Sequence, residues 1–506
     1  MIGAKSLNTH LPNTRSVLLF CMTIAAGMLA IPAISFPAYW FLAPLSLGLF
    51  FFALWRLSSL ARAFWHSFIF GLFTGGSGIW WFWDTLPLDW LGLSHGPNEY
   101  YFVFASWGPV TLAFALATAV FCIPIWLLRN SPYHALAAAL LWVFVEEAVM
   151  WSFSLLTFAD RSFYGPHFSA PSLGYALAEN HYLLQIAQGG GIHFLNFTTA
   201  LIGAVFASLI LWRTNTSQMI RSLHSVAPAV LLLVLIYPLV QPPPAPRTVE
   251  PLEAVLVATY IPVGRAEVPP NEYELLLENI VDSYPNAGVI ILPEEKRLEP
   301  TYKDPKEKQV FLSSLFGSSK RLIISGEHVA ATDRGLEAAL TYETETGARL
   351  GMYRKRFLMP GGEYMPTIMG LGFSLRPDKG LGKFINSLPE RRSERVDLPT
   401  ASYQGRIFGG LICSDFLSPH LYRELAVRQH ADVLVNIANP AWFHGSRILF
   451  DKTVQVAKVH AVQNRAHYLQ STNGAPAFAI DPTGTVIGMT TWNEKELLSV
   501  HLPGNK

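Results

Sequence analysis

The chain contains 506 residues, of which 51% are hydrophobic and 14% are charged, and its formal net charge is +1. This length is enough for two or three domains, and the apolar excess excludes a purely soluble protein. A nearly neutral chain without a basic patch offers no electrostatic attraction for nucleic acid. Three cysteines, Cys21, Cys122 and Cys413, supply neither a disulfide framework nor a zinc site.

The first half of the chain, residues 1–241, predicts an α-helical transmembrane bundle. Apolar stretches recur there, each close to the roughly 20 residues that a helix needs to cross a bilayer. Seven such stretches cover residues 16–36, 38–55, 63–82, 101–127, 134–156, 193–212 and 225–241. We do not interpret the first as a cleavable signal peptide, because a second apolar stretch follows it almost at once.

Positive charges predict the orientation of this bundle. Arg161 is the only Lys or Arg in the alternate loops 83–100 and 157–192. On the other side of the predicted spans lie Lys5, Arg15, Arg56, Arg62, Arg129, Arg213 and Arg221. Because Lys and Arg concentrate in cytoplasmic loops, the N-terminus is expected in the cytoplasm. Everything after Pro242 is then expected in the periplasm, as in a multi-pass protein of a bacterial inner membrane.

Two carboxylates, Glu146 and Glu147, lie in the middle of the predicted span 134–156. A carboxylate at this depth costs about 2.5–3.5 kcal/mol or more unless it is paired or faces water. One interpretation is a polar cavity near the path of a substrate. The other is a structural hydrogen bond inside the bundle, and the sequence favours neither.

A proline-rich linker, residues 242–250, is expected to be stiff and extended, and it separates the bundle from a second domain at residues 251–506. Strand-like runs such as Ala254–Tyr260 alternate in this domain with helical patterns such as Glu272–Ser283. This alternation predicts an α/β layered fold.

Cys413 lies between an apolar run, Ile407–Ile412, and a helical pattern, Pro419–Gln429. A strand, a sharp turn and a helix would project the sulfur clear of the sheet. Backbone N–H groups at the turn could then face a developing oxyanion. An isolated cysteine in this context is more often buried and inert, so the functional interpretation depends on further residues.

Two upstream motifs supply these residues. Glu294 and Glu295 follow an apolar run that ends at Leu292 and Pro293, and Lys355 lies in the basic segment before Met359. Each motif alone is a weak signal, but together with the cysteine they provide an acid/base group, a cation and a thiol. We favour Glu294 as the reactive carboxylate, since side chains alternate along a strand and Glu295 then points to the other face.

Glu294, Lys355 and Cys413, in this order along the chain, resemble the Glu–Lys–Cys triad of the nitrilase, or carbon–nitrogen hydrolase, superfamily. With the preceding spans, the chain resembles the apolipoprotein N-acyltransferases. The stretch Tyr353–Pro366 is similar to that family's Tyr-x-Lys-x-x-Leu-x-Pro-x-Gly-Glu-Tyr-x-Pro motif, and Trp142–Glu146 is similar to its Trp-x-x-x-Glu pattern. The resemblance implies a nitrilase-like αββα sandwich after the bundle.

The resemblance also implies roles for individual residues. Glu294 corresponds to the general base, Lys355 to the cation that stabilises the oxyanion, and Cys413 to the nucleophile. Binding or supporting positions correspond to Glu363, Asp415, Trp442 and Glu146.

The implied activity is the transfer of a fatty acyl group from a phospholipid, through a thioester on Cys413, to the N-terminal amine of a diacylglyceryl apolipoprotein. The implied enzyme is a membrane-bound monomer that uses neither a cofactor nor a metal. The hydroxyl that follows the nucleophile, Ser414, and the ring of Pro440 stand where the family commonly has Tyr and Asp. Two alternatives therefore accompany this prediction: a membrane-tethered amidase, or an acyltransferase with another amine acceptor. A third, an inactive membrane scaffold, is disfavoured by the intact Glu–Lys–Cys set.

Overall fold

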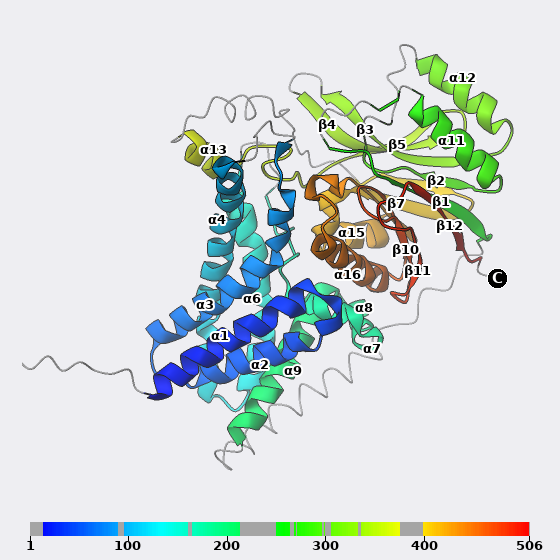
Figure 1. Cartoon of the computed structure of the whole chain (residues 1–506). Coiled ribbons are helices and arrows are strands. Elements are labelled where there is room, and N and C mark those ends of the chain that lie inside the picture. Colours follow the sequence, from blue (N-terminus) through cyan, green and yellow to red (C-terminus); the bar gives the residue numbers. More distant parts are fainter. Residues whose placement is uncertain are drawn as a thin grey trace, which may run out of the picture.

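The structure is a computed structural model that describes residues 14–89, 96–159, 164–212, 249–263, 268–269, 271–295, 298, 305–331, 335–374 and 398–504. The described chain is helical up to residue 212, and a sheet flanked by helices begins at Leu252. Figure 1 shows the helical part below and to the left of the α/β part. The expected order, a helical bundle followed by an α/β domain, is confirmed.

The bundle is built from long apolar helices joined by short helical turns. Its elements are α1 (Thr14–Ser35), η1 (Pro37–Tyr39), α2 (Leu42–Trp55), α3 (Leu60–Gly78), η2 (Trp80–Thr85), α4 (Pro97–Phe121), α5 (Ile123–Leu127), η4 (Leu128–Asn130), α6 (His134–Leu156), η5 (Leu173–Glu179), α7 (His181–Leu184), α8 (Ala187–Gly190) and α9 (Ile192–Trp212).

Four helical stretches among the described residues are long and apolar enough to cross a bilayer: Thr14–Ser35, Pro97–Asn130, His134–Leu156 and Ile192–Leu211. The helix α2 is apolar but has only 14 residues. The expected span 225–241 lies outside the described residues. The prediction of seven spans is therefore not confirmed.

Close packing of α3 against α4 depends on glycine. A Cβ atom on Gly71 would lie 2.7 Å from Ala115 Cα, and one on Gly75 would lie 2.7 Å from Phe114 Cβ. Small residues at a helix interface let the backbones approach, which is how helices associate in a lipid environment. Gly71 and Gly75 therefore allow α3 and α4 to pack closely.

The α/β part contains strands at fairly regular intervals, with helices between some of them. The strands are β1 (Leu252–Thr259), β2 (Val289–Ile291), β3 (Leu322–Ala331), β4 (Gly335–Thr344), β5 (Arg349–Arg354), β6 (Thr400–Tyr403), β7 (Arg406–Ile412), β8 (Val433–Ala438), β9 (His467–Asn473), β10 (Phe478–Ile480), β11 (Val486–Met489) and β12 (Glu496–Leu502). The helical elements are α11 (Glu272–Ser283), α12 (Pro305–Phe316), α13 (Thr367–Ser374), η6 (Cys413–Leu417), α15 (Leu421–Arg428), η7 (Pro440–Phe443) and α16 (Arg447–Asn464).

Hydrogen bonds connect the strands in the order β5-β4-β3-β2-β1-β9-β8-β7-β6, while β12 pairs with β1 and β10 pairs with β9 and β11. The two ends of this sheet pack face to face. The backbone N–H of Gly410 on β7 donates to Tyr342 Oη on β4 over 2.6 Å. A Cβ atom on Gly410 would lie 2.6 Å from Leu340 Cδ1, so a larger residue here would require Leu340 to move. The result is a two-layered sandwich.

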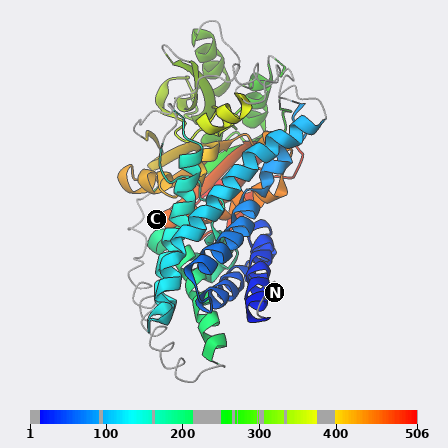
Figure 2. The ribbon, with the colours of Figure 1, turned by 90° about the vertical axis from the view of Figure 1, so that its left-hand side faces the viewer.

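Helices cover both outer faces of the sandwich. Alternate residues of β1, such as Val255 and Val257, pack in one apolar cluster with α11 and α12. The residues between them, such as Leu256, belong to a second cluster that contains β7, β8, β9, α15 and α16. That second cluster continues into the bundle through Trp81, Phe153 and Tyr175. One apolar core therefore joins the α/β domain to the bundle, and Figure 2 shows the two parts in contact in a second view.

The sequence-based elements agree with the structure where the hydrophobic pattern is strong. The predicted helix Glu272–Ser283 has the bounds of α11, and the predicted strand Ile407–Ile412 is β7 with one more residue at its start. The helix predicted to begin at Pro419 begins at Leu421 instead. The short 3-10 turn η6 comes between the strand and this helix.

The packing of α3 on α4 leads to a stability prediction. Gly71→Ala should lower the thermal midpoint of the detergent-solubilised protein, because the new methyl group must displace α4 at a cost of about 1–3 kcal/mol. Gly108→Ala is the matched control, since its Cβ would meet Phe104 Cζ at an ordinary 3.5 Å. Its midpoint should stay unchanged or rise. Equal midpoints for the two variants, measured by tryptophan fluorescence on heating, would contradict the close packing.

Candidate active site

Cys413 lies at the end of β7, at the first position of the turn η6. Its backbone has a φ of 44°, a conformation that side chains other than Gly, Asn and Asp rarely adopt. Such strain costs about 1–3 kcal/mol and persists only where the surroundings fix it. The predicted strand, sharp turn and helix are therefore present, and Cys413 is half-buried.

Lys355 follows β5 and is only 3% exposed. Its Nζ atom lies 3.4 Å from Glu294 Oε1 and 3.1 Å from Glu363 Oε1. Burial by itself lowers the pKa of this lysine, but the two carboxylates outweigh burial and raise the pKa above its ordinary value. The lysine is therefore a permanent cation held between two acidic side chains.

The thiol of Cys413 belongs to the same electrostatic cluster. Burial raises its pKa to about 12, while the ammonium of Lys355 acts in the opposite direction and Glu294 and Glu363 add to the rise. A thiol with this pKa is protonated at neutral pH, so an attack by sulfur requires a base. Glu294, the carboxylate beside Lys355, is available for that task.

The two adjacent glutamates at the end of β2 have different environments. Glu294 contacts Lys355, whereas Glu295 is buried, and its Oε2 accepts hydrogen bonds from Asn439 Nδ2 and Asn473 Nδ2, each over 3.2 Å. The amide contacts fix Glu295 against the ends of β8 and β9. Glu294 is therefore the carboxylate of this pair that contacts the ammonium group.

Asp415 connects the nucleophile turn to the segment that carries Lys355. Its buried carboxylate accepts hydrogen bonds from Phe357 N at 2.6 Å, Tyr353 Oη at 2.8 Å and Arg356 N at 3.3 Å. Burial raises the pKa of Asp415 to about 6, and Lys355 and these donors counteract part of that rise. The neighbouring Ser414 Oγ donates to the carbonyl of Phe357 over 2.6 Å. Asp415 and Ser414 thus fix the distance between the nucleophile and the cation.

Glu363 is held in a loop that reaches the top of the bundle. Its Oε2 accepts from Met359 N over 2.7 Å. The next residue, Tyr364, donates through its hydroxyl to the carbonyl of Thr157 at the end of α6 over 2.8 Å, and Thr367 N donates to Phe158 O over 3.0 Å. The helix α6 therefore supports the loop that contributes one of the two carboxylates around the lysine.

Trp442 and Glu146 lie on η7 and α6, which are not the elements that carry the charged cluster. Trp442 is on η7, after Asn439, and is 38% exposed. The adjacent Phe443 packs edge to face on Trp81 of the bundle, with 4.9 Å between ring centroids. The segment around Trp442 therefore contributes to the junction between the α/β domain and η2.

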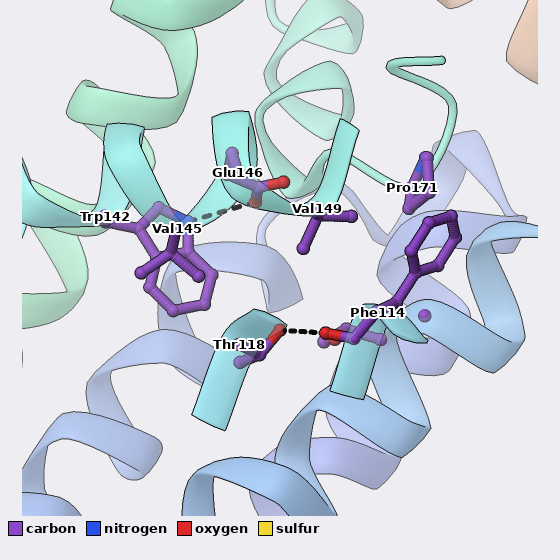
Figure 3. Close-up of a pocket in the computed structure, with 9 residues that line it drawn as sticks. Phe114, Thr118, Trp142, Val145, Glu146, Val149 and Pro171 are labelled. Atoms are coloured by element: carbon purple, nitrogen blue, oxygen red, sulfur yellow. Dashed lines mark hydrogen bonds between the residues drawn. The ribbon is translucent and has the colours of Figure 1, made fainter. Parts of the chain in front are cut away.

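Glu146 is buried on α6, where its Oε1 accepts from Trp142 Nε1 over 3.1 Å and from Leu173 N over 3.3 Å. It also lines a small pocket inside the bundle, between α3, α4, α6 and Pro171 (Figure 3). The structural hydrogen bonds of the second interpretation are therefore present, whereas the pocket beside Glu146 is lined mostly by apolar residues.

Some contacting residues were not identified from the sequence. Asn439 and Asn473 hold Glu295, and Tyr353 holds Asp415. Asn439 directly follows β8 and Asn473 ends β9, so an amide side chain at a strand end is the signal that could have identified them. Tyr353 occupies the first position of the lysine motif, but only the fold brings it to Asp415.

Comparison with known proteins gives matches along both parts of the chain. Residues 26–205 match the family model described as apolipoprotein N-acyltransferase N-terminal domain, and residues 318–505 match the one described as carbon-nitrogen hydrolase. An apolipoprotein N-acyltransferase from Pseudomonas putida is 26% identical over 472 residues, which are 92% of this chain and 87% of the relative. One from Rickettsia prowazekii is 23% identical over 461 residues, 88% and 84% of the two chains.

Among solved structures, an amidase from Nesterenkonia sp. matches with a TM-score of 0.37 and 16% sequence identity. The match covers 51% of this chain and 92% of the amidase.

The charged cluster predicts how fast Cys413 reacts with iodoacetamide. Because its pKa is raised to about 12, the alkylation rate should rise through pH 7–9.5 without a plateau. At pH 9, Lys355→Gln should react more slowly than the wild type, since loss of the cation raises the pKa of the thiol. Glu363→Gln should react faster, since loss of a negative charge lowers it. The readout is the mass of the Cys413 peptide, and a cysteine-containing peptide added to the same reaction is the reference. A plateau near pH 8 would contradict the protonated resting thiol.

Proposed function

Since the chain belongs to the apolipoprotein N-acyltransferases of the carbon–nitrogen hydrolase superfamily, we propose that it transfers an acyl group from a phospholipid to the N-terminal amine of diacylglyceryl apolipoproteins. The proposal includes a covalent intermediate, a thioester on Cys413. The observation that carries it is the buried ammonium of Lys355 between Glu294 and Glu363, in electrostatic contact with the thiol.

In the first half of the proposed reaction, the sulfur of Cys413 attacks the ester carbonyl of the phospholipid while Glu294 takes the thiol proton. The negative charge on the carbonyl oxygen is stabilised by the Lys355 ammonium and by backbone N–H groups of the turn, and one such donor is commonly worth about 3–4 kcal/mol. The C–O bond then breaks. The departing lysophospholipid oxygen receives the proton from Glu294, and the acyl group stays on sulfur.

In the second half, the amine of the apolipoprotein attacks the thioester carbonyl and gives a proton to Glu294. The C–S bond breaks, and the proton returns to the sulfur of Cys413. The same base and the same oxyanion-stabilising groups serve both halves. We assign Glu363 and Asp415 supporting roles, because one flanks Lys355 and the other fixes its distance from the turn.

Trp442 and Glu146 are proposed to act at the borders of the substrate path. The partly exposed ring of Trp442 offers apolar surface at the junction with the bundle, and Glu146 borders the pocket within the bundle. A multi-pass protein of a bacterial inner membrane fits the apolar helices. We further propose that the chain divides into a bundle at 1–241, a linker at 242–250 and a catalytic domain at 251–506. The distribution of Lys and Arg supports a periplasmic catalytic domain, and we propose that the enzyme acts as a monomer.

The proposal is tested in Gram-negative cells depleted of their own N-acyltransferase. Expression of the wild-type chain should restore triacylated lipoproteins, measured by the mass of the N-terminal lipopeptide. Cys413→Ala should not restore them, because the thioester cannot form. Cys21→Ser, which changes an exposed cysteine of α1, should restore them fully. Intact protein purified from membranes should carry an acyl adduct that is absent in Cys413→Ala.

Correct membrane insertion with no triacylated product would refute the assignment to apolipoproteins. If small amides were hydrolysed instead, the amidase alternative would replace it.

A further inference from the structure

The turn that carries the nucleophile ends with backbone carbonyls that need hydrogen-bond donors. The last carbonyls of any helix have no partner within it, and η6 has only five residues. The carbonyl of Phe416 accepts from His460 Nε2 on α16 over 2.7 Å. The carbonyl of Leu417 accepts from Ser169 Oγ over 2.5 Å and from Ser169 N over 3.4 Å. Ser169 precedes η5 and belongs to the bundle, 248 residues earlier in the chain.

The direction of each hydrogen bond follows from its partners. A carbonyl oxygen only accepts, so the single proton of the Ser169 hydroxyl points to Leu417 O. The Ser169 oxygen also lies 2.7 Å from Tyr175 Oη, and it must therefore accept the proton of the phenol. Ser169 and Tyr175 are fully buried, and Leu417 is 2% exposed. A fixed chain of hydrogen bonds thus runs from η5 of the bundle to the end of the nucleophile turn.

Lys452, a lysine of the α/β domain, lies against Tyr175, the first residue in this series of hydrogen bonds. Lys452 Nζ on α16 is 5.5 Å from the ring centroid of Tyr175, and the side chain is 3% exposed. Among the described residues this nitrogen has no hydrogen-bond partner. Burial lowers the pKa of Lys452 to about 8, although Glu179 and Glu146 counteract the effect. An ammonium this close to an aromatic ring is attracted to it, so Lys452 helps to hold the ring of Tyr175 in place.

We propose that Ser169 is a positioning residue for Cys413, that Tyr175 orients its hydroxyl, and that the bundle completes the active site through this contact. The inference rests on the proposed role of Cys413 as the nucleophile. At the start of the turn, Ser414 and Asp415 bind the segment that carries Lys355. At its end, His460 and Ser169 donate to the carbonyls of Phe416 and Leu417. The strained backbone of Cys413 is therefore fixed by contacts along the whole turn.

Among the described residues, the donors to the carbonyl of Leu417 are the hydroxyl and the backbone N–H of Ser169. Without the hydroxyl of Ser169, the carbonyl of Leu417 keeps only the long bond from the backbone N–H. A buried carbonyl that loses its donor destabilises the conformation that presents it, so the turn would populate other geometries. The sulfur would then sample positions that are misaligned with the base and the cation.

The test is Ser169→Ala in the full-length protein, reconstituted with phospholipid and an apolipoprotein peptide. We expect kcat for N-acyl transfer to fall on the order of tenfold to a hundredfold, because misplacing a reacting atom has effects of that size. KM for the phospholipid should stay within about twofold, since Ser169 is not placed at the bound donor. The alkylation rate of Cys413, a readout that needs no lipid substrate, should change as well.

Ser208→Ala is the matched control. Ser208 is a buried serine of α9 that donates to Ala204 O over 2.8 Å and lies 3.1 Å from His134 Nε2. The substitution removes the same group from the bundle without touching the turn, so kcat and alkylation should match the wild type. The double variant Ser169→Ala/Tyr175→Phe should have the same kcat as Ser169→Ala, because both substitutions interrupt the same series of hydrogen bonds.

Equal kcat in Ser169→Ala and Ser208→Ala would overturn the inference. A lower total activity would overturn it as well if kcat per folded molecule stays unchanged and only the yield of folded protein falls. If Ser169→Ala does not fold, Tyr175→Phe decides: a lowered kcat supports the inference and an unchanged one overturns it. A wild type without acyl transfer, in which Ser169→Ala still alters alkylation of Cys413, would refute the proposed function and leave the positioning role standing.

Discussion

The buried ammonium group of Lys355 is the constraint on which the site depends. A cation that is only 3% exposed needs compensating charge, because the cost of leaving it unpaired is several kcal/mol. Glu294, which follows β2, and Glu363, in the loop after Lys355, supply that charge. The same ammonium opposes the rise in the thiol pKa of Cys413. The need to pair one cation therefore brings together segments that are far apart in the sequence.

The thiol itself is held in a strained conformation by groups from three directions. Asp415 and Ser414 connect the turn to the lysine segment, His460 connects it to α16, and Ser169 connects it to the bundle. The apolar core that crosses the junction includes Trp81, and it holds the two parts of the molecule, and so these donors, at fixed positions. Under the proposed function, the helical bundle would therefore support the active site as well as anchor the protein.

The sequence predicted most of the fold because its signals are local. Apolar runs such as Val289–Ile291 and the amphipathic pattern of α11 depend on neighbouring residues alone. Glu294 could be favoured over Glu295 from strand alternation, and in the structure it is Glu294 that contacts the lysine. Ser169 and His460 could not be predicted, because their partners lie 248 and 44 residues away and are backbone carbonyls, which carry no residue-type signal.

Ser414, which stands where the family commonly has Tyr, contacts Phe357 of the lysine segment in the structure. Ser414 donates to the carbonyl of Phe357, and the ring of Phe357 stacks on His167 of the bundle with 4.0 Å between centroids. This pair fills the space between the turn and the loop before η5, so Ser414 has a structural explanation that requires no change of chemistry. A different amine acceptor would have to be recognised elsewhere, and the partly exposed junction around Trp442 is the part of the described surface where such a difference should be sought.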